Sequence, residues 1–397
     1  METKTIRELC DIVVDCPHST PKWTTSGKIV IRNNNIKKGR IDFSSPSYTD
    51  DEHFNLRVKR AIPRSGDIII TREAPMGEVG MIPERIECCL GQRMVLLRTN
   101  PDICDNYYLL YSLQSKFVQH QISWSEGTGT TVSNLRIPHL EQLKIPYVPL
   151  KKQRLVASVL KSIEEKIILN EQINNNLEQQ IEMVLLKTIN DTDTQPVKLG
   201  DYLYIKGRIG WKGLKKSEYL PISNYRIING ESLTLSGIDW NKAGYISAER
   251  YEESPEIMLS IGDILLSKDG TIGKIGYVDK LDAPTSVASG IFVIRNTRQS
   301  EISTQFIYYL LKSKLFKAFI ASRTEGSVIP HLYQKDFMEF EFQLPSPDDM
   351  KIFDDTTADM FSLVFSNLNE NERLIHLRDS LLPKLMSGEL DVSDTDI

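Results

Sequence analysis

Basic and amide side chains are concentrated in one short segment near the start of the 397-residue chain. A short apolar run, Ile29–Ile31, leads into side chains that carry several hydrogen-bond donors, namely Arg32, Asn33, Asn34, Lys37, Lys38 and Arg40. An arginine fork matches the O6 and N7 edge of guanine, an asparagine amide matches N6 and N7 of adenine, and lysines suit phosphates. The segment is therefore a candidate surface for reading a nucleic acid; the alternative is an ordinary polar hairpin.

Two further arginines lie beyond buried runs in the first half of the chain. Arg72 and Glu73 follow the apolar run Ile68–Thr71, and Gln92 and Arg93 lie in a loop that contains Gly91. Side chains at strand ends can reach a ligand outside the sheet. The two arginines and their neighbours Glu73 and Gln92 are therefore candidate contacts to the bases or to the backbone of a nucleic acid.

The second half of the chain offers a corresponding set of donors. The run Tyr219–Ile222 is predicted to be the strand that corresponds to Ile29–Ile31, with Ser223 in the place of Arg32. The candidate contacts near this strand and beyond a later one are Lys212, Lys215, Lys216, Asn224, Arg226 and Lys268. Different donors at corresponding places are typical of two surfaces with different base preferences.

Signatures of catalysis are weak. Pro347–Lys351 resembles part of a nuclease motif, but it lacks the separated carboxylate and is predicted to be a helix start with acidic first-turn residues. Gly270–Gly273 is not followed by the Lys-Ser/Thr of a phosphate-binding loop. The Asn/Asp-Pro-Pro-Tyr motif of adenine methylation is missing from the sequence. We therefore predict that the chain has no catalytic residues, binds no metal and binds no cofactor.

The composition is that of a folded protein without a membrane span. Hydrophobic residues make up 40% and charged residues 25% of the chain, and no apolar run approaches about 18 residues. The five cysteines are odd in number and form no Cys-x-x-Cys pair, which favours a reducing cytoplasm. The net charge of −5 conceals mildly basic segments at 1–150 and 198–340 and an acidic segment at 346–397.

An internal repeat with a long period divides the chain. Residues 65–72 (SGDIIITR) recur as residues 261–268 (IGDILLSK), at an offset of 196. The helical pattern at 107–115 recurs at 306–313, and Thr131–Leu135 recurs as Val328–Leu332. The order of features is kept while the identity is low, which predicts two domains of one fold with different binding surfaces.

Each copy of the repeat ends in a helical seam. Over residues 156–184, apolar side chains alternate at spacings of four and three, as in a coiled coil. At an offset of 197, Asn170 and Asn174 correspond to Asn367 and Asn371. Buried asparagines at seam positions fix register at a cost in stability. We therefore predict that the two helices pack antiparallel through shared polar layers.

This layout resembles that of the specificity subunits of Type I restriction–modification systems (the HsdS family) over nearly the whole chain. The segments that carry the resemblance are Ile31–Ile36 with Lys38-Gly39, Ser65–Ile68, Gly129–Arg154 and Leu381–Leu390. The resemblance implies an α+β fold with a pseudo-twofold repeat, in which two similar mixed α/β target-recognition domains are separated by two long helices packed as an antiparallel coiled coil. The expected divisions are recognition domains at 1–150 and 197–345, and spacer helices at 151–190 and 346–390.

The resemblance also implies a function and a set of partners. Each recognition domain would read one half of a split site in double-stranded DNA, and the chain would position catalysts rather than act as an enzyme. Two methyltransferase (M) subunits would dock on the helical spacer, and restriction/translocase (R) subunits would join them. S-adenosylmethionine, Mg²⁺ and ATP would belong to those partners.

One position departs from the symmetry of the seam, and two alternative functions remain open. Arg378 stands at the seam position that Ile181 occupies in the first copy, so an ion pair or a partner contact is expected there. The chain could instead serve another methylation-based phage-defence system. From a different class of protein, it could be a coiled-coil adaptor whose duplicated domains bind protein.

Overall fold

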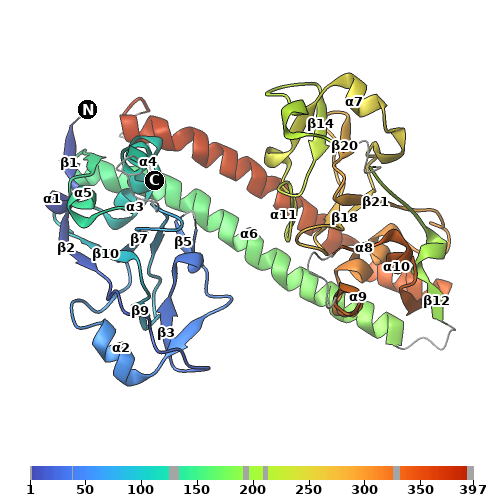
Figure 1. The fold of residues 1–397 in the computed structure, drawn as a ribbon, viewed down its shortest axis with the longest axis horizontal. Helices are drawn as coiled ribbons and strands as arrows, with labels where there is room; N and C mark the ends of the chain where they lie inside the picture. Colours follow the sequence, from blue (N-terminus) through green and yellow to red (C-terminus); the bar gives the residue numbers. More distant parts are fainter. Residues whose placement is uncertain are drawn as a thin grey trace. The chain divides into compact units, whose positions relative to one another are not determined.

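The computed structural model describes residues 2–37, 39–124, 134–190, 196–208, 213–324 and 331–390. The chain forms two compact units, of which the first comprises Met1–Leu169 with Glu370–Ile397 and the second comprises Asn170–Asn369. Each unit combines a mixed α/β domain with part of two long helices, α6 (Leu150–Asn190) and α11 (Pro347–Ser387) (Figure 1).

The two larger sheets of the first unit's domain have four and three strands. Its elements in chain order are β1 (Thr3–Thr5), α1 (Ile6–Leu9), β2 (Cys10–Asp15), β3 (Lys28–Ile31), η1 (Asn33–Asn35), β4 (Ile36–Lys37), β5 (Arg40–Ile41), β6 (Ser47–Thr49), α2 (Asp51–Arg57), β7 (Ile68–Thr71), β8 (Val79–Met81), β9 (Cys88–Leu90), β10 (Met94–Thr99), α3 (Asn106–Gln114), α4 (Lys116–Ser123), α5 (Ile137–Glu141) and β11 (Lys144–Pro146). One sheet has the antiparallel order β2-β10-β7-β8. The other has the order β6-β3-β9, in which β3 and β9 are parallel.

The domain of the second unit repeats this topology. Its elements are β12 (Pro196–Lys198), η3 (Leu199–Tyr202), β13 (Leu203–Gly207), η5 (Lys216–Glu218), β14 (Tyr225–Ile228), β15 (Leu233–Thr234), β16 (Gly237–Ile238), η6 (Trp240–Lys242), β17 (Gly244–Ile246), α7 (Ala248–Glu252), η7 (Pro255–Ile257), β18 (Ile264–Ser267), β19 (Ile275–Tyr277), β20 (Thr285–Val287), β21 (Ile291–Asn296), α8 (Thr304–Lys312), α9 (Lys314–Thr324), α10 (Gln334–Met338) and β22 (Glu341–Gln343). The sheet orders are β13-β21-β18-β19 and β17-β14-β20, and β14 and β20 form the parallel pair. The duplicated α+β fold predicted from the sequence is therefore confirmed.

A repeated turn explains why the Gly-Asp motif recurs in both copies. Gly66 and Gly262 adopt left-handed backbone conformations, with φ of 85° and 94°, which glycine reaches without a steric penalty. The aspartate that follows each glycine is buried and accepts hydrogen bonds from an arginine of the neighbouring strand. Arg98 Nε lies 2.8 Å from Asp67 Oδ1, and Arg295 Nε lies 2.8 Å from Asp263 Oδ1. The motif thus links the start of β7 to β10 in the first unit and the start of β18 to β21 in the second.

One helix in each unit covers the antiparallel sheet. Asp105 caps α3 by accepting a hydrogen bond from the backbone N–H of Tyr108, and Ser303 caps α8 in the same way. Leu109 and Leu113 of α3 belong to one buried core with Ile68 of β7. These are the two amphipathic helices that the sequence repeat predicts.

The long helices pack against each other within each unit. In the first unit, Val156 and Leu160 of α6 share a buried cluster with Leu385 and Met386 of α11. In the second unit, residues 181–189 of α6 share a core with residues 350–365 of α11. Higher residue numbers of α6 face lower numbers of α11, so the pairing is antiparallel, as predicted.

All four seam asparagines are buried, and hydrogen bonds of Asn174, Asn367 and Asn371 join the two helices. In the second unit, Asn367 Nδ2 donates to Asn174 Oδ1 over 2.8 Å, and Asn174 Nδ2 donates to the carbonyl oxygen of Val364 over 3.1 Å. In the first unit, Asn371 Nδ2 donates to the carbonyl oxygen of Ile167 over 3.3 Å. A register shift would separate these donors from their acceptors, and a buried donor without a partner costs about 1–3 kcal/mol.

One predicted strand of the second unit is wrong. The strand that corresponds to Lys28–Ile31 is β14, Tyr225–Ile228, not Tyr219–Ile222. Pro221 lacks the N–H that a strand paired on both sides must donate, which disfavours the earlier run. The counterpart of Arg32 is therefore Asn229 rather than Ser223. Each of the two donates its backbone N–H to a side chain three residues ahead.

The seam layer at Arg378 differs between the two units. Arg378 Nη1 lies 3.0 Å from Glu164 Oε2, and Arg40 Nε of β5 bonds the other oxygen of the same carboxylate. The ion pair expected at Arg378 is therefore present. At the corresponding layer of the second unit, Ile181 and Phe361 belong to an apolar cluster.

Three smaller expectations also have an outcome. The five cysteines are all buried, and none forms a disulfide. Helix α11 begins at Pro347 and is capped by Ser346, whose Oγ accepts a hydrogen bond from the backbone N–H of Asp349 over 3.2 Å. Pro347–Lys351 is therefore a helix start, as predicted. Within the described ranges, no helix is both long enough and apolar enough to cross a membrane.

Candidate nucleic-acid interface

The segment after β3 exposes two of the predicted reading residues. Arg32 is exposed, and its guanidinium lies over the ring of Trp23, 5.3 Å from the centroid. Asn34 is also exposed, within the 3₁₀ turn η1. Contact with an aromatic ring restrains the arginine but leaves its N–H groups free to donate. Both residues can therefore reach a ligand.

The two flanking asparagines hold this turn in place. Asn33 Nδ2 donates to the carbonyl oxygen of Glu73 over 2.8 Å. Asn35 is buried; its Oδ1 accepts the backbone N–H of Arg32 at 2.9 Å, and its Nδ2 donates to the carbonyl oxygen of Asp42 at 3.0 Å. The run of three asparagines thus combines one exposed amide with two that shape the backbone.

The remaining basic residues of this segment differ in exposure and in whether their side chains bond other residues of the unit. Lys37 is exposed at the end of β4. Arg40 bonds Glu164 of α6 and is therefore partly committed inside the unit. Lys38 lies outside the described residues, as do Lys212 and the predicted repeat segments Thr131–Ser133 and Val328–Pro330.

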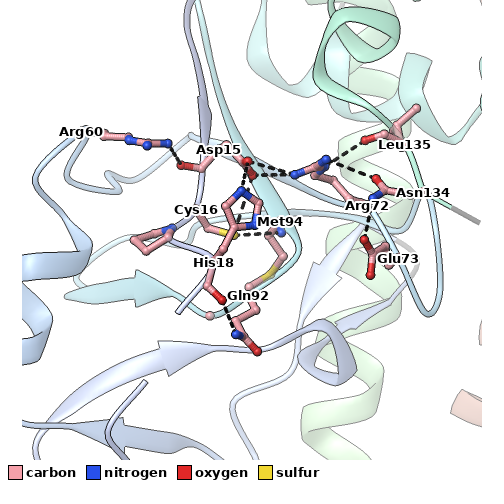
Figure 2. A network of polar contacts seen from close by, with 12 residues as sticks. Asp15, Cys16, His18, Arg60, Arg72, Glu73, Gln92, Met94, Asn134 and Leu135 are labelled. Carbon is pink, nitrogen blue, oxygen red and sulfur yellow. Dashed lines mark hydrogen bonds and ion pairs between the residues drawn. The ribbon is translucent and has the colours of Figure 1, made fainter. Parts of the chain in front are cut away.

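A chain of polar contacts lies at the ends of β2, β7 and β10 (Figure 2). We call it the first polar cluster, and its members are Asp15, Arg72, Glu73, Arg93 and Asn134. Arg72, Glu73 and Arg93 were candidate contacts from the sequence. Asp15 and Asn134 reach them through the fold.

Arg72 is the fixed centre of the first polar cluster. Its Nη1 lies 3.1 and 2.9 Å from the two carboxylate oxygens of Asp15, its Nε donates to the carbonyl oxygen of Leu135 over 2.9 Å, and its Nη2 donates to Asn134 Oδ1 over 3.2 Å. The side chains of Arg72 and Asp15 are only 11% and 14% exposed. This geometry favours a positioning role for Arg72, whose predicted contact with DNA stays untested.

Arg93 is the exposed end of the first polar cluster. Asn134 Nδ2 donates to Glu73 Oε1 over 2.7 Å, and Arg93 Nε lies 3.1 Å from Glu73 Oε2. The Arg93 side chain is 55% exposed, and its backbone has a φ of 65°. Left-handed backbone at a residue other than glycine costs about 1 kcal/mol or more, and such strain clusters at functional sites.

Sequence reasoning selected Glu73 beside Arg72, but it did not select Asp15 and Asn134. One signal did point to Asn134, because Asn134-Leu135 recurs as His331-Leu332 in the sequence repeat. Asp15 carried no local signal, since nothing in β2 marks it as the partner of an arginine 57 residues away. It also pairs with His18, whose Nε2 lies 3.0 Å from Asp15 Oδ2.

The second unit has a corresponding cluster with different side chains. We call it the second polar cluster, and its members are Gly207, Lys268, Asp269, Gly290 and His331. Asp269 pairs with Nδ1 of His331, where Glu73 pairs with Asn134 in the first cluster. Burial lowers the pKa of Lys268 from its usual range.

The other predicted contacts of the second unit fall into an exposed and a held group. Lys215 and Lys216 are exposed at the start of η5, and Asn224 is exposed just before β14. Arg226 lies within β14, where its Nη2 donates to the carbonyl oxygen of Trp240 and its guanidinium lies 5.8 Å from the ring centre of Tyr245. The first three can reach a ligand, whereas Arg226 is engaged within the domain.

Fold and clusters together define a class of protein: a duplicated α+β protein whose two domains share one strand order and place different side chains at corresponding positions. The family model for the Type I restriction modification DNA specificity domain matches residues 1–179 and again residues 192–375. The chain therefore belongs to this family of DNA specificity domains.

Curated relatives match the chain over most of their length. The type I restriction enzyme MjaVIII specificity subunit of Methanocaldococcus jannaschii is 24% identical over 392 residues, which cover 90% of this chain and 88% of that protein. The MjaIX specificity subunit of the same organism is 23% identical over 399 residues, which cover 96% and 88%. Among solved structures, the S subunit of a type I restriction–modification system from M. genitalium shares the fold, with a TM-score of 0.58 at 19% identity over 97% of this chain and 95% of that one.

Proposed function

We propose that this chain is the DNA sequence-specificity subunit of a Type I restriction–modification complex, in which each domain reads one half of a bipartite site. The observation that carries the proposal is the duplication itself. Two domains with the same strand order place different side chains at corresponding positions, such as Arg72 and Lys268. Family membership and the names of the relatives support the same function.

In this proposal the chain reads DNA without catalysing a reaction. Its exposed candidate donors are Arg32, Asn34, Lys37, Arg93, Lys215, Lys216 and Asn224, with Lys268 half-buried. Arginine and asparagine side chains supply paired donors and acceptors for base edges, whereas lysines neutralise phosphates. Contacts of the first kind specify sequence, and contacts of the second kind position the protein on the duplex.

The chemistry would belong to partner subunits. We propose that the paired helices α6 and α11 set the separation of the two half-sites and dock two methyltransferase subunits, which restriction/translocase subunits join. A methyltransferase must extrude its target base from the duplex, so a separate reader that fixes its position supplies the sequence specificity. S-adenosylmethionine, Mg²⁺ and ATP would bind to these partners.

The proposal is tested by mapping methylation. The chain is expressed with its cognate methyltransferase in an unmethylated host, and modified adenines are located by single-molecule sequencing. We expect a split motif. Exchanging residues 1–150 for those of a relative should alter one half of the motif, and exchanging residues 198–345 should alter the other half.

Two outcomes would contradict the proposal in different ways. If the two proteins co-purify but no new methylation appears, the chain is an adaptor that binds protein. If either exchange alters both halves of the motif together, the two domains do not read separate half-sites.

A further inference from the structure

The two polar clusters rest on the same backbone hydrogen bonds. In the first, the N–H of Arg72 donates to the carbonyl oxygen of Arg93 over 2.8 Å, and the N–H of Leu135 donates to the carbonyl oxygen of Arg72 over 2.9 Å. In the second, Lys268 donates to Gly290 over 2.9 Å, and Leu332 donates to Lys268 over 3.0 Å. Arg72 and Lys268 therefore occupy corresponding places, and any difference between them comes from side chains.

The carboxylate that neutralises Arg72 has no counterpart in the second polar cluster. Asp15 lies opposite the second residue of β10, and Gly207 lies opposite the second residue of β21, so the two positions correspond. A Cβ atom placed on Gly207 would lie 3.4 Å from Lys268 Nζ. The site of the missing side chain is therefore beside the ammonium group.

Lys268 is half-buried beside an aromatic ring. Its Nζ lies 4.9 Å from the ring centre of Phe292. Across the ranges that the structure describes, no carboxylate comes within 4.0 Å of this nitrogen. Asp269, the neighbouring acid, is bonded to His331. Burial favours the neutral amine and lowers the pKa of Lys268. An ammonium group in this setting gains more from an external acceptor than a fully hydrated lysine does.

We propose that Lys268 is the cation with which the second domain binds an acceptor on DNA. In the first domain, Asp15 pairs with the corresponding Arg72 and prevents such a contact. The acceptor is either a phosphate oxygen or the O6 and N7 edge of a guanine, because an ammonium group serves both. This inference rests on the proposed function and makes the two half-sites depend on different kinds of contact.

The test uses the complete complex of the chain with its methyltransferase. Lys268→Met removes the charge, Lys268→Arg keeps it, and Gly207→Asp supplies the missing carboxylate. We expect Lys268→Met and Gly207→Asp each to weaken binding of the complex's own methylation site about tenfold, and Lys268→Arg to retain most of the affinity. Lys206→Met is the matched control, because Lys206 precedes Gly207 in β13 and points to the other face of the sheet.

Salt titration and motif mapping separate the two acceptors. Loss of a phosphate contact reduces the magnitude of the negative slope of log affinity against log salt by about 1 and leaves the motif unchanged. Loss of a guanine contact relaxes one base within the half-site read by residues 198–345. Either result supports the proposal.

Thermal melting of each variant excludes a loss of folding. The added Cβ of Gly207→Asp would lie 3.3 Å from the carbonyl oxygen of Ile291, so a shift of a few tenths of an ångström is needed. If Lys268→Met unfolds, Gly207→Asp and Lys268→Arg still decide the question. Wild-type affinity, salt slope and motif in folded Lys268→Met or Gly207→Asp complexes would overturn this inference and leave the proposed function intact. A wild-type complex that methylates no split motif would instead contradict the proposed function.

Discussion

At the scale of single residues, burial and pairing decide which cations can serve as contacts. Arg72 and Arg93 lie in the same polar cluster, but Arg72 gives its donors to Asp15, Leu135 and Asn134, whereas Arg93 makes one ion pair and is largely exposed. A guanidinium whose N–H groups bond several neighbours positions those neighbours. An exposed guanidinium that is bonded through Nε keeps its terminal NH₂ groups available to a ligand.

The Arg72–Asp15 pair leads to a stability prediction. Asp15→Asn should lower the free energy of unfolding by about 2–3 kcal/mol, because it leaves the largely buried guanidinium of Arg72 without its counter-charge. Urea denaturation measures the change. Asp11→Asn is the control, since Asp11 is exposed on the same strand. Equal stability of the two variants would show that the pair contributes nothing to folding.

The buried cysteines give a prediction about reactivity and pH. Burial raises the pKa of Cys10 and of Cys88 to about 12. At pH 8 the thiolate fraction of each is then on the order of 10⁻⁴, so we expect a thiol reagent to label the folded chain very slowly and the urea-unfolded chain rapidly. Because the folded pKa lies above the unfolded one, the stability tied to these thiols is complete below about pH 8.5 and is lost as the pH rises toward 12. Rapid labelling of Cys88 in the folded chain would be inconsistent with this burial.

At the scale of elements, the two units pack α6 against α11 with different kinds of side-chain contact at a corresponding layer. The first unit joins Glu164 to both Arg378 and Arg40, whereas the second unit fills the corresponding layer with Ile181 and Phe361. Buried ion pairs stabilise little compared with apolar packing, but removing one partner leaves uncompensated charge. Removing one member of the charged layer is therefore destabilising, whereas the ion pair as a whole can be replaced by apolar side chains at little cost in stability.

This difference predicts the outcome of a substitution series. Glu164→Leu should cost about 3 kcal/mol of unfolding free energy, because Arg378 and Arg40 both lose the largely buried carboxylate of Glu164, and the other carboxylate beside Arg378, that of Asp379, is 60% exposed. The double variant Glu164→Phe with Arg378→Ile copies the second unit and should regain most of that loss. Urea denaturation of Glu164→Phe, Arg378→Ile and the double variant measures the coupling.

An exposed ion pair between the same helices supplies the control. Lys166 Nζ lies 3.1 Å from Glu370 Oε2, and these side chains are 44% and 37% exposed, against 16% and 14% for Arg378 and Glu164. Glu370→Leu should therefore cost less than about 1 kcal/mol. A comparable loss from Glu164→Leu and Glu370→Leu would contradict the importance assigned to burial.

At the scale of the whole molecule, the last helix completes the first unit. Residues from Glu370 onward belong to the same compact unit as residues 1–169. Leu385 and Met386 are buried against Tyr108 of α3 and Leu160 of α6, and Ser112 Oγ lies 3.3 Å from Met386 Sδ. The hydrophobic core of the first unit therefore depends on residues more than 200 positions away in the chain.

This closure predicts a long-range effect of a mutation near the end of the chain. Leu385→Ala should destabilise the first unit by about 2–4 kcal/mol, because it opens a cavity in a buried cluster. Hydrogen exchange should rise in α3 and in the first half of α6. Leu377→Ala is the control, since Leu377 is exposed on the same helix. Faster exchange confined to residues around 385 would refute this coupling.

The sequence by itself determined the duplication, the short helices α3 and α8, the two long seams and their asparagine layers. These features follow from local periodicity and from a repeat, which a single chain displays directly. The one strand placed wrongly, at Tyr219–Ile222, contained a proline and lay six residues before the true strand β14. There, strand pairing within the sheet outweighed local hydrophobicity.

Only the tertiary structure decided which of the predicted donors are free. Asp15 lies 57 residues before Arg72, and Glu164 lies 214 residues before Arg378, yet each carboxylate determines what its arginine can do. The strength of an ion pair depends on distance and on exclusion of water, and both are set by packing between segments that no local pattern connects. The contrast between Arg72, which Asp15 neutralises, and Lys268, which has Gly207 in the corresponding place, therefore depends on strand pairing in the two sheets.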